Sequence, residues 1–153
     1  METLQISKAN ALSAYRKADK KVKELLEELF GKQVLSTEVT ERIKSFEDAC
    51  LELGIDSTDA NFSNGTVDEI AYKKLKVIAA ALNEGTVLSF ADSNQRKWYP
   101  WFEYSGSGFR FYGTTYVLSR THSNGGSRLC FHTEKLAAYA GKQFIDLYND
   151  LLK

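Results

Sequence analysis

The chain of 153 residues has little proline, cysteine or methionine: one Pro, one Met and two Cys. Two cysteines are too few for the disulfide framework of a small secreted domain, so we expect Cys50 and Cys130 to be free, buried thiols. No apolar stretch approaches the ~18 residues of a membrane-spanning helix, and the first residues, METLQISKANAL, have no basic start before an apolar run. The sequence therefore predicts a cytoplasmic protein without a membrane segment.

Net charge is also lacking, because 20 basic residues balance 20 acidic ones. A neutral chain has no overall field that would draw it to nucleic acid or to a membrane surface. The length predicts a single domain over residues 1–153. The segment 96–132 departs from the balance, with five Lys or Arg, one acid and ten of the nineteen aromatic residues. A binding surface is therefore expected in this segment.

Motifs for catalysis or metal binding are missing as well. His122 and His132 have no Cys, Asp or Glu at a metal-ligand spacing, and the glycines of the segment lack the helix and lysine of a phosphate loop. Cys130 and His132 stand two apart on an expected strand, where a Cys–His nucleophile is one interpretation. A buried strand cysteine beside a surface histidine is the commoner case. We therefore expect no metal, no cofactor and no enzymatic activity.

The first predicted helix runs from a cap at Ser7 to about Phe30 and ends at Gly31. Its basic run, 16–23, precedes its acids and is interpreted as a solvated face, with a functional patch as the alternative. The apolar positions recur three and four apart, as in a helix face packed on a core. This face consists of Leu12, Tyr15, Ala18, Val22, Leu25 and Leu29.

Three further helices are predicted from the same periodicity. One covers about 38–53, and the next begins at a Thr66–Glu69 capping box and ends at Gly85. The last covers 134–153 and includes Gly141, whose place inside a helix indicates a close approach of another element.

Between these helices, from residue 97, the period changes to two, which predicts strands. WFEY and FRFY flank a Ser-Gly-Ser-Gly loop, and TYVLSR and SRLCFH flank a turn with Asn124-Gly125. The predicted fold is α+β, with three N-terminal helices, an antiparallel meander of three to four strands and one C-terminal helix packed on the sheet. We expect the first, third and last helices to cover one sheet face.

Alternation along the strands divides the side chains between two faces. The predicted core face holds Phe102, Tyr104, Phe109, Phe111, Leu129 and Phe131. The candidate binding residues are the aromatic and basic members of the opposite face, which they share with Cys130: Tyr99, Trp101, Arg110, Tyr112, Arg128 and His132. Such a face fits a protein interface, where Tyr, Trp and Arg dominate. Single-stranded nucleic acid, with bases stacked on the rings, and ordinary surface are the alternatives.

A resemblance to a known family is carried by four stretches: ERIKSFEDACLELGI, DEIAYKKLKVIAAALNEG, KWYPWFEY and GSRLCFHTEKLAAYAGKQFIDLYNDLL. They resemble a family of small proteins encoded by phages and prophages of gut anaerobic bacteria, from about residue 5 to the end. The chain departs from this pattern after Gly85, where the relatives tend to have Trp and Pro. The family has no assigned activity, so the resemblance implies context and no catalytic residues. Relatives tend to have Lys at the position of His132, which argues against a catalytic histidine and suits a basic face.

Taken together, these features predict a non-enzymatic accessory protein of a phage or mobile element that acts by binding. The expected partner is a protein, which could be a second copy of the chain, a host factor or a virion component. Single-stranded nucleic acid is the alternative partner, and no membrane is involved.

Overall fold

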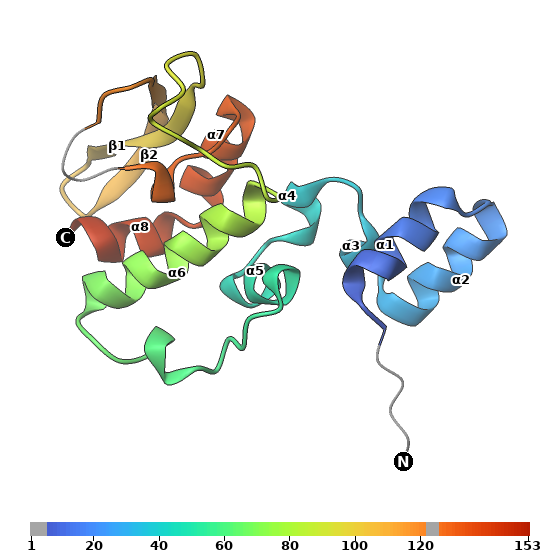
Figure 1. The fold of residues 1–153 in the computed structure, drawn as a ribbon. Helices are drawn as coiled ribbons and strands as arrows, with labels where there is room; N and C mark the ends of the chain where they lie inside the picture. Colours follow the sequence, from blue (N-terminus) through green and yellow to red (C-terminus); the bar gives the residue numbers. More distant parts are fainter. Residues whose placement is uncertain (1–5, 122–125) are drawn as a thin grey trace. The chain divides into compact units, whose positions relative to one another are not determined.

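The computed structural model describes residues 6–121 and 126–153. It divides the chain into two compact units, Met1–Arg42 and Ile43–Lys153, and a single domain over the whole chain stays a prediction. The predicted turn at Asn124-Gly125 and His122 lie outside the described residues. Figure 1 labels the helices and strands of both units.

The first unit is helical, with α1 (Lys8–Lys17), α2 (Lys20–Phe30), α3 (Lys32–Leu35) and α4 (Val39–Arg42). The predicted cap at Ser7 is confirmed, since its side chain accepts a hydrogen bond from the Asn10 N–H at 3.2 Å. The predicted single helix is wrong, because the chain is extended at Ala18 and Asp19 caps a new helix by accepting from the Val22 N–H. An aspartate oxygen that satisfies a free N–H starts a helix as well as serine does.

The helices of the second unit are α5 (Phe46–Leu53), α6 (Val67–Leu82), α7 (Glu134–Gln143) and α8 (Ile145–Leu152), with a 3₁₀ turn, η1, at Ala60–Phe62. The predicted helix over 38–53 is divided into α4 and α5, because Ser45 and Asp48 form a capping box that starts α5. The start of α6 is confirmed, where the Glu69 carboxylate accepts from the Thr66 N–H at 2.8 Å. The last predicted helix is divided at Phe144.

The sheet of the second unit has two antiparallel strands, β1 (Lys97–Tyr104) and β2 (Phe109–Val117). The α+β class is therefore confirmed, while the meander of three to four strands is wrong for the described residues. FRFY and TYV belong to one strand, because a bulge at Tyr112 absorbs the irregularity: Trp101 pairs with Gly113, and Phe102 pairs with Phe111.

The predicted last strand, SRLCFH, is replaced by a 3₁₀ turn, η2 (Ser127–Leu129), and a single bridge. In this bridge Phe131 exchanges two backbone hydrogen bonds with Trp98 of β1, at 2.9 and 2.7 Å. The segment therefore lies beside β1 instead of continuing the hairpin from β2. The residues on either side of Phe131, Cys130 and His132, form backbone hydrogen bonds with the Asn83 side chain.

Helices α7 and α8 pack against the hairpin of β1 and β2 (Figure 1). The close approach predicted at Gly141 is confirmed: a Cβ atom there would lie 2.6 Å from Cβ of Pro100 and 2.7 Å from the ring of Phe111. The ring of Phe102 lies 4.7 Å from that of Tyr148 in α8. The hydrophobic core of the second unit is formed by Ile43, by Phe131 and by side chains of its helices. The main helical members are Ala49, Cys50, Leu75, Ile78, Leu82, Ala137 and Ala140.

The predicted division of the aromatic side chains holds for most of the core face. Phe131 is 1% exposed, and Phe102 and Phe111 are partly covered, whereas Arg110 and Arg128 are exposed. Tyr104 is the exception, because it lies at the tip of the hairpin, is 60% exposed and donates its hydroxyl to the Gly106 carbonyl.

The two cysteines are free and buried, as predicted. No helix among the described residues is long and apolar enough to cross a membrane.

Candidate functional site

A pocket of about 430 Å³ opens beside Trp101 in the second unit. Its volume lies within the range of roughly 300–1,000 Å³ that is usual for ligand pockets. The lining residues come from β1, β2, the segment before α7 and the helix α8: Tyr99, Pro100, Trp101, Phe102, Phe109, Val117, Thr121, Gly126, Leu129, Cys130, Tyr148, Leu151 and Leu152. None of these side chains carries a formal charge at neutral pH. We call this hollow the Trp101 pocket.

One wall of the Trp101 pocket is made by β1. Tyr99 and Trp101 are two residues apart in the strand and point to the same side, with ring centroids 6.2 Å apart. Tyr99 is partly covered, and Trp101 is 50% exposed. The indole therefore lies at the rim, in contact with both the pocket and solvent.

The facing wall is made by α8, which an asparagine fixes to the hairpin. The Asn149 side chain accepts from the Phe109 N–H at 2.7 Å and donates to the Phe109 carbonyl at 2.8 Å. Gly108 leaves room for this contact, since a Cβ atom there would lie 2.7 Å from the Asn149 oxygen. This contact holds the hairpin and α8 together where Phe109 and Tyr148 line the pocket.

Three titratable groups line the pocket, and burial favours the protonated form of each. It raises the pKa of the Cys130 thiol to about 11 and raises the pKa of the Tyr148 hydroxyl well above its usual value. The pKa of Tyr99 is raised for the same reason. Cys130 donates its S–H to the Gly126 carbonyl at 3.1 Å. The pocket is therefore apolar and neutral at physiological pH.

A buried ammonium group lies near the pocket. Lys97 is fully buried, and its Nζ donates to the carbonyls of Gln95, Leu118 and Asp92 at 2.8, 3.0 and 3.4 Å. The same Nζ lies 5.1 Å from the ring of Phe90. These contacts join the loop before β1 to the end of β2. The sequence analysis did not predict this role for Lys97. The one available signal was its position two residues before Tyr99, which places both side chains on the same face of the strand.

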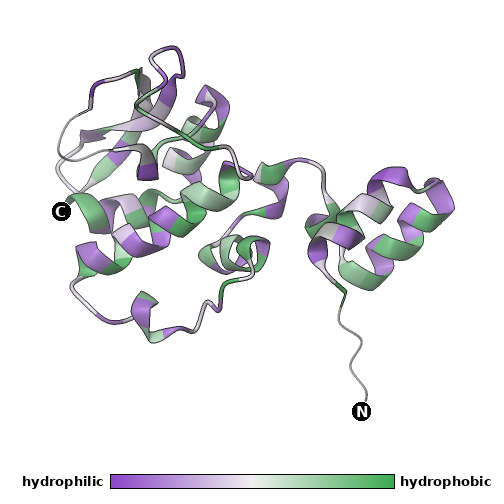
Figure 2. Cartoon of the chain, viewed as in Figure 1, coloured by the Kyte–Doolittle hydropathy of each residue, from purple (hydrophilic) through white to green (hydrophobic). Residues whose placement is uncertain are grey.

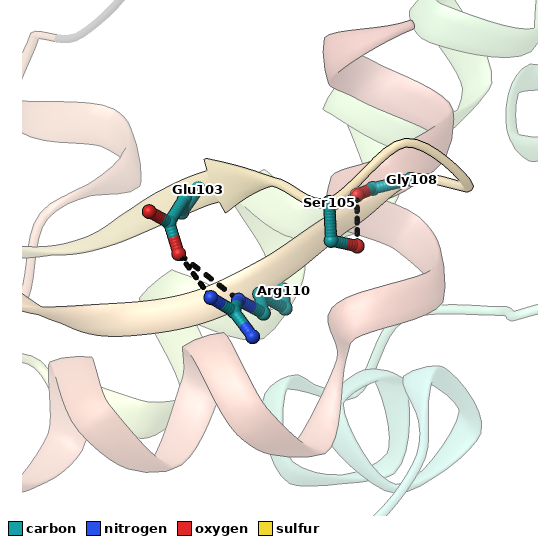
Figure 3. Close-up of polar contacts among 4 residues, drawn as sticks. All are labelled: Glu103, Ser105, Gly108 and Arg110. Atoms are coloured by element: carbon teal, nitrogen blue, oxygen red, sulfur yellow. Dashed lines mark hydrogen bonds and ion pairs between the residues drawn. The ribbon is translucent and has the colours of Figure 1, made fainter.

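Arg110 and Tyr112, which were predicted to belong to the binding face, do not line the pocket. The Arg110 guanidinium donates to one oxygen of Glu103, its partner across the strands, at 3.0 Å from Nε and 2.5 Å from Nη2 (Figure 3). Its charge is therefore neutralised at the surface. Tyr112 is the bulge residue and is 69% exposed.

Arg128 and His132 lie elsewhere in the second unit. Arg128 lines a different hollow, of about 450 Å³, with Lys76, Asn83 and Gly85 at the end of α6. The ring Nδ1 of His132 lies 3.0 Å from Oδ1 of Asn83. Of the six predicted residues, the structure thus brings only Tyr99 and Trp101 together at the pocket.

The Asn83 side chain forms the backbone hydrogen bonds that a neighbouring strand would otherwise form with the segment around Phe131. The buried Asn83 side chain donates to the Cys130 carbonyl at 2.9 Å and accepts from the His132 N–H at 2.9 Å. The imidazole is thus held on Asn83, while the Cys130 thiol is bonded to Gly126. This arrangement gives no Cys–His pair, because neither side chain is bonded to the other.

Comparison of the chain with protein families, with curated proteins and with solved structures gives no match. Within residues 6–121 and 126–153, no three His, Cys, Asp or Glu side chains are grouped so that they could hold a metal ion.

Proposed function

We propose that the protein acts by binding another protein and that the Trp101 pocket takes an apolar side chain of that partner. The observation that carries the proposal is the half-exposed Trp101 indole at the rim of an apolar, uncharged pocket. Protein interfaces concentrate their binding energy in such places, where a buried anchor fills a pocket bordered by tryptophan or tyrosine.

The surroundings of Trp101 support a protein partner. Glu103, next on the same strand face, forms its ion pair with Arg110 and gives the apolar pocket a polar border. A largely apolar centre with a polar rim is the usual anatomy of a protein interface.

The distribution of positive charge favours a protein over single-stranded nucleic acid. A single-strand site needs open ring faces with cations left for the phosphates. Here Arg110 is paired with Glu103, and the guanidinium of Arg96 lies 4.7 Å from the ring centroid of Tyr116. Lys142 lies in the same way over Phe111, at 5.1 Å. These three cations are therefore engaged by groups of the chain itself.

A non-enzymatic role is part of the proposal. The thiolate is the nucleophilic form of cysteine, and a pKa of about 11 leaves Cys130 almost wholly protonated at neutral pH. We place the protein in a phage or mobile element and in the host cytoplasm. The four resembling stretches support the first placement, and the free thiols of Cys50 and Cys130 support the second.

The test is a selection of random short displayed peptides on the wild-type protein, followed by affinity measurements on two variants. Trp101→Ala removes the rim indole, whereas Tyr112→Ala removes an exposed ring of the same hairpin that does not line the pocket. We expect the enriched peptides to share an apolar residue and to bind Trp101→Ala at least about tenfold more weakly, while Tyr112→Ala binds as the wild type does.

Two outcomes would overturn the proposal. One is a selection that enriches nothing, or that enriches peptides bound equally by Trp101→Ala. The other is binding of an oligothymidylate that weakens steeply with salt and with Trp101→Ala, since phosphate contacts release counterions. The second outcome would assign the face to single-stranded nucleic acid.

A further inference from the structure

Helix α2 of the first unit has an apolar stripe that faces solvent. Val22, Leu25 and Leu29 are 45%, 54% and 65% exposed, and α2, which is described along its whole length, has no buried residue. At about 100° per residue, the three side chains fall within an arc of about 60°. Figure 2 shows such apolar positions recurring between polar ones along this helix. The sequence predicted these residues to be part of a core face.

The other side of α2 is already occupied within the first unit. The Tyr15 hydroxyl of α1 donates to the Glu27 carboxylate, and the ammonium of Lys23 lies 5.5 Å from the Tyr15 ring centroid. Leu26 and Phe30 are half-buried on the same side. These contacts fix the rotation of α2 about its axis and leave the stripe of Val22, Leu25 and Leu29 turned away from α1.

Two opposite charges border the exposed stripe on one side. Lys21 and Glu28 are seven residues apart, so they lie within about 20° of each other on the helix surface, both beside the stripe. Both are exposed, with Lys21 at the N-terminal end of the stripe and Glu28 at its C-terminal end. An antiparallel copy of α2 would place Lys21 of each chain beside Glu28 of the other. In a parallel pair the same two residues of the two chains would lie on opposite sides of the contact, so Lys21 and Glu28 would not meet.

We infer that the occupant of this stripe is a second copy of the chain, with the two α2 helices packed antiparallel about a twofold axis. A twofold interface uses the same patch on both chains, so both Lys21–Glu28 contacts form at once. The antiparallel arrangement also sets the two helix dipoles in opposition. Together with the two α1 helices, the pair would form a four-helix arrangement.

The dimer is expected to be weak and to depend on concentration. Eleven residues of α2 span only about 16 Å, and three apolar side chains per chain bury less than a standard interface of about 1,600 Å². We expect a dissociation constant on the order of 10–100 µM for the full chain.

Sedimentation equilibrium of the full chain over a wide range of concentration, at low salt, tests this inference. Lys21→Glu and Glu28→Lys should each weaken the dimer about tenfold, because each exchange replaces two attractions by two repulsions. The double variant, Lys21→Glu with Glu28→Lys, should restore wild-type affinity. Leu25→Ser should abolish association, with helicity by circular dichroism showing that the exposed substitution leaves the fold intact.

A chain that stays monomeric at every concentration would overturn the inference, as would a dimer that survives Leu25→Ser unchanged. Single charge variants that dimerise as the wild type does would also overturn it, because a parallel pair does not gain from the Lys21–Glu28 pattern. Trp101→Ala should leave the monomer–dimer equilibrium unchanged. The result is therefore independent of partner binding at the Trp101 pocket.

Discussion

The Asn149 side chain bonds both polar groups of the Phe109 backbone, although the two residues are 40 positions apart: it accepts from the N–H at 2.7 Å and donates to the carbonyl at 2.8 Å. A side-chain amide thus acts as a strand partner at the edge of β2. Because Phe109 and the neighbouring Tyr148 both line the Trp101 pocket, this contact holds the two walls of the pocket together.

Asn149→Asp should destabilise the protein by about 2 kcal/mol at pH 7. The carboxylate keeps the shape of the amide and can still accept from the Phe109 N–H, but it has no N–H to donate to the Phe109 carbonyl. The deficit should shrink as the pH falls through about 4, because a protonated aspartate can donate. Urea unfolding at pH 7 and at lower pH measures both effects, with the exposed Asp150→Asn as the control. Equal unfolding free energies for Asn149→Asp and wild type would contradict this reading of the contact.

Gly141→Ala should destabilise the protein by about 1–3 kcal/mol, because the added methyl group meets Pro100 and Phe111. An ordinary glycine in a helix gives the opposite sign, since alanine is favoured there by about 1 kcal/mol. Ala138→Gly in the same helix is the matched control and should lose about 1 kcal/mol. If Gly141→Ala raises the thermal midpoint, α7 does not approach the hairpin as closely as the structure shows.

Cys130 should make the protein less stable in alkali. Its thiol ionises near pH 8.5 in the unfolded chain and at a pKa of about 11 in the fold, so the unfolded state loses its proton first as the pH rises. The free energy of unfolding should therefore fall between about pH 9 and 11, by at most about 1.4 kcal/mol per pH unit from this group. Tyr139, whose pKa is raised to about 12 by burial, adds to the fall only above about pH 10.

Urea unfolding at several pH values between about 8 and 10 tests this effect in the wild type and in Cys130→Ala. The variant should start from a lower stability, because it loses buried sulfur, and should then show a flatter dependence on pH. Parallel curves would mean that the Cys130 thiol titrates alike in the folded and unfolded chain.

Lys97→Met should cost about 2–3 kcal/mol, since it keeps the apolar stem and removes the donor shared by three carbonyls. Lys142→Met is the control: this lysine is exposed, and its loss should change the unfolding free energy by less than about 0.5 kcal/mol. If the two substitutions cost the same, the buried ammonium does not join the loop to the sheet.

Local signals in the sequence predicted the elements that depend on neighbouring residues. The cap at Ser7, the capping box of Thr66 and Glu69 and the close approach at Gly141 are all confirmed. The missed breaks at Asp19 and Ser45 have the same local chemistry, but each stands inside a longer apolar period that favoured one continuous helix.

Long-range contacts were not predictable in this way. The segment around Phe131 reads as a strand by alternation, yet Asn83, 47 positions before Cys130, supplies its hydrogen bonds in place of a further strand. Tyr99 and Trp101 could be found because both lie on one strand face. Tyr148 joins them from α8 through the fold, and no spacing in the sequence relates it to β1.

The most direct test of the account is a titration of the full chain with 3-methylindole, an analogue of an apolar side chain, followed by the backbone amide resonances in solution. We predict saturable shifts at Tyr99, Trp101, Cys130 and Tyr148, which Trp101→Ala weakens strongly and Tyr112→Ala leaves unchanged. Shifts that never saturate, that spread evenly over the protein or that respond equally to both substitutions would contradict a binding site at the Trp101 pocket.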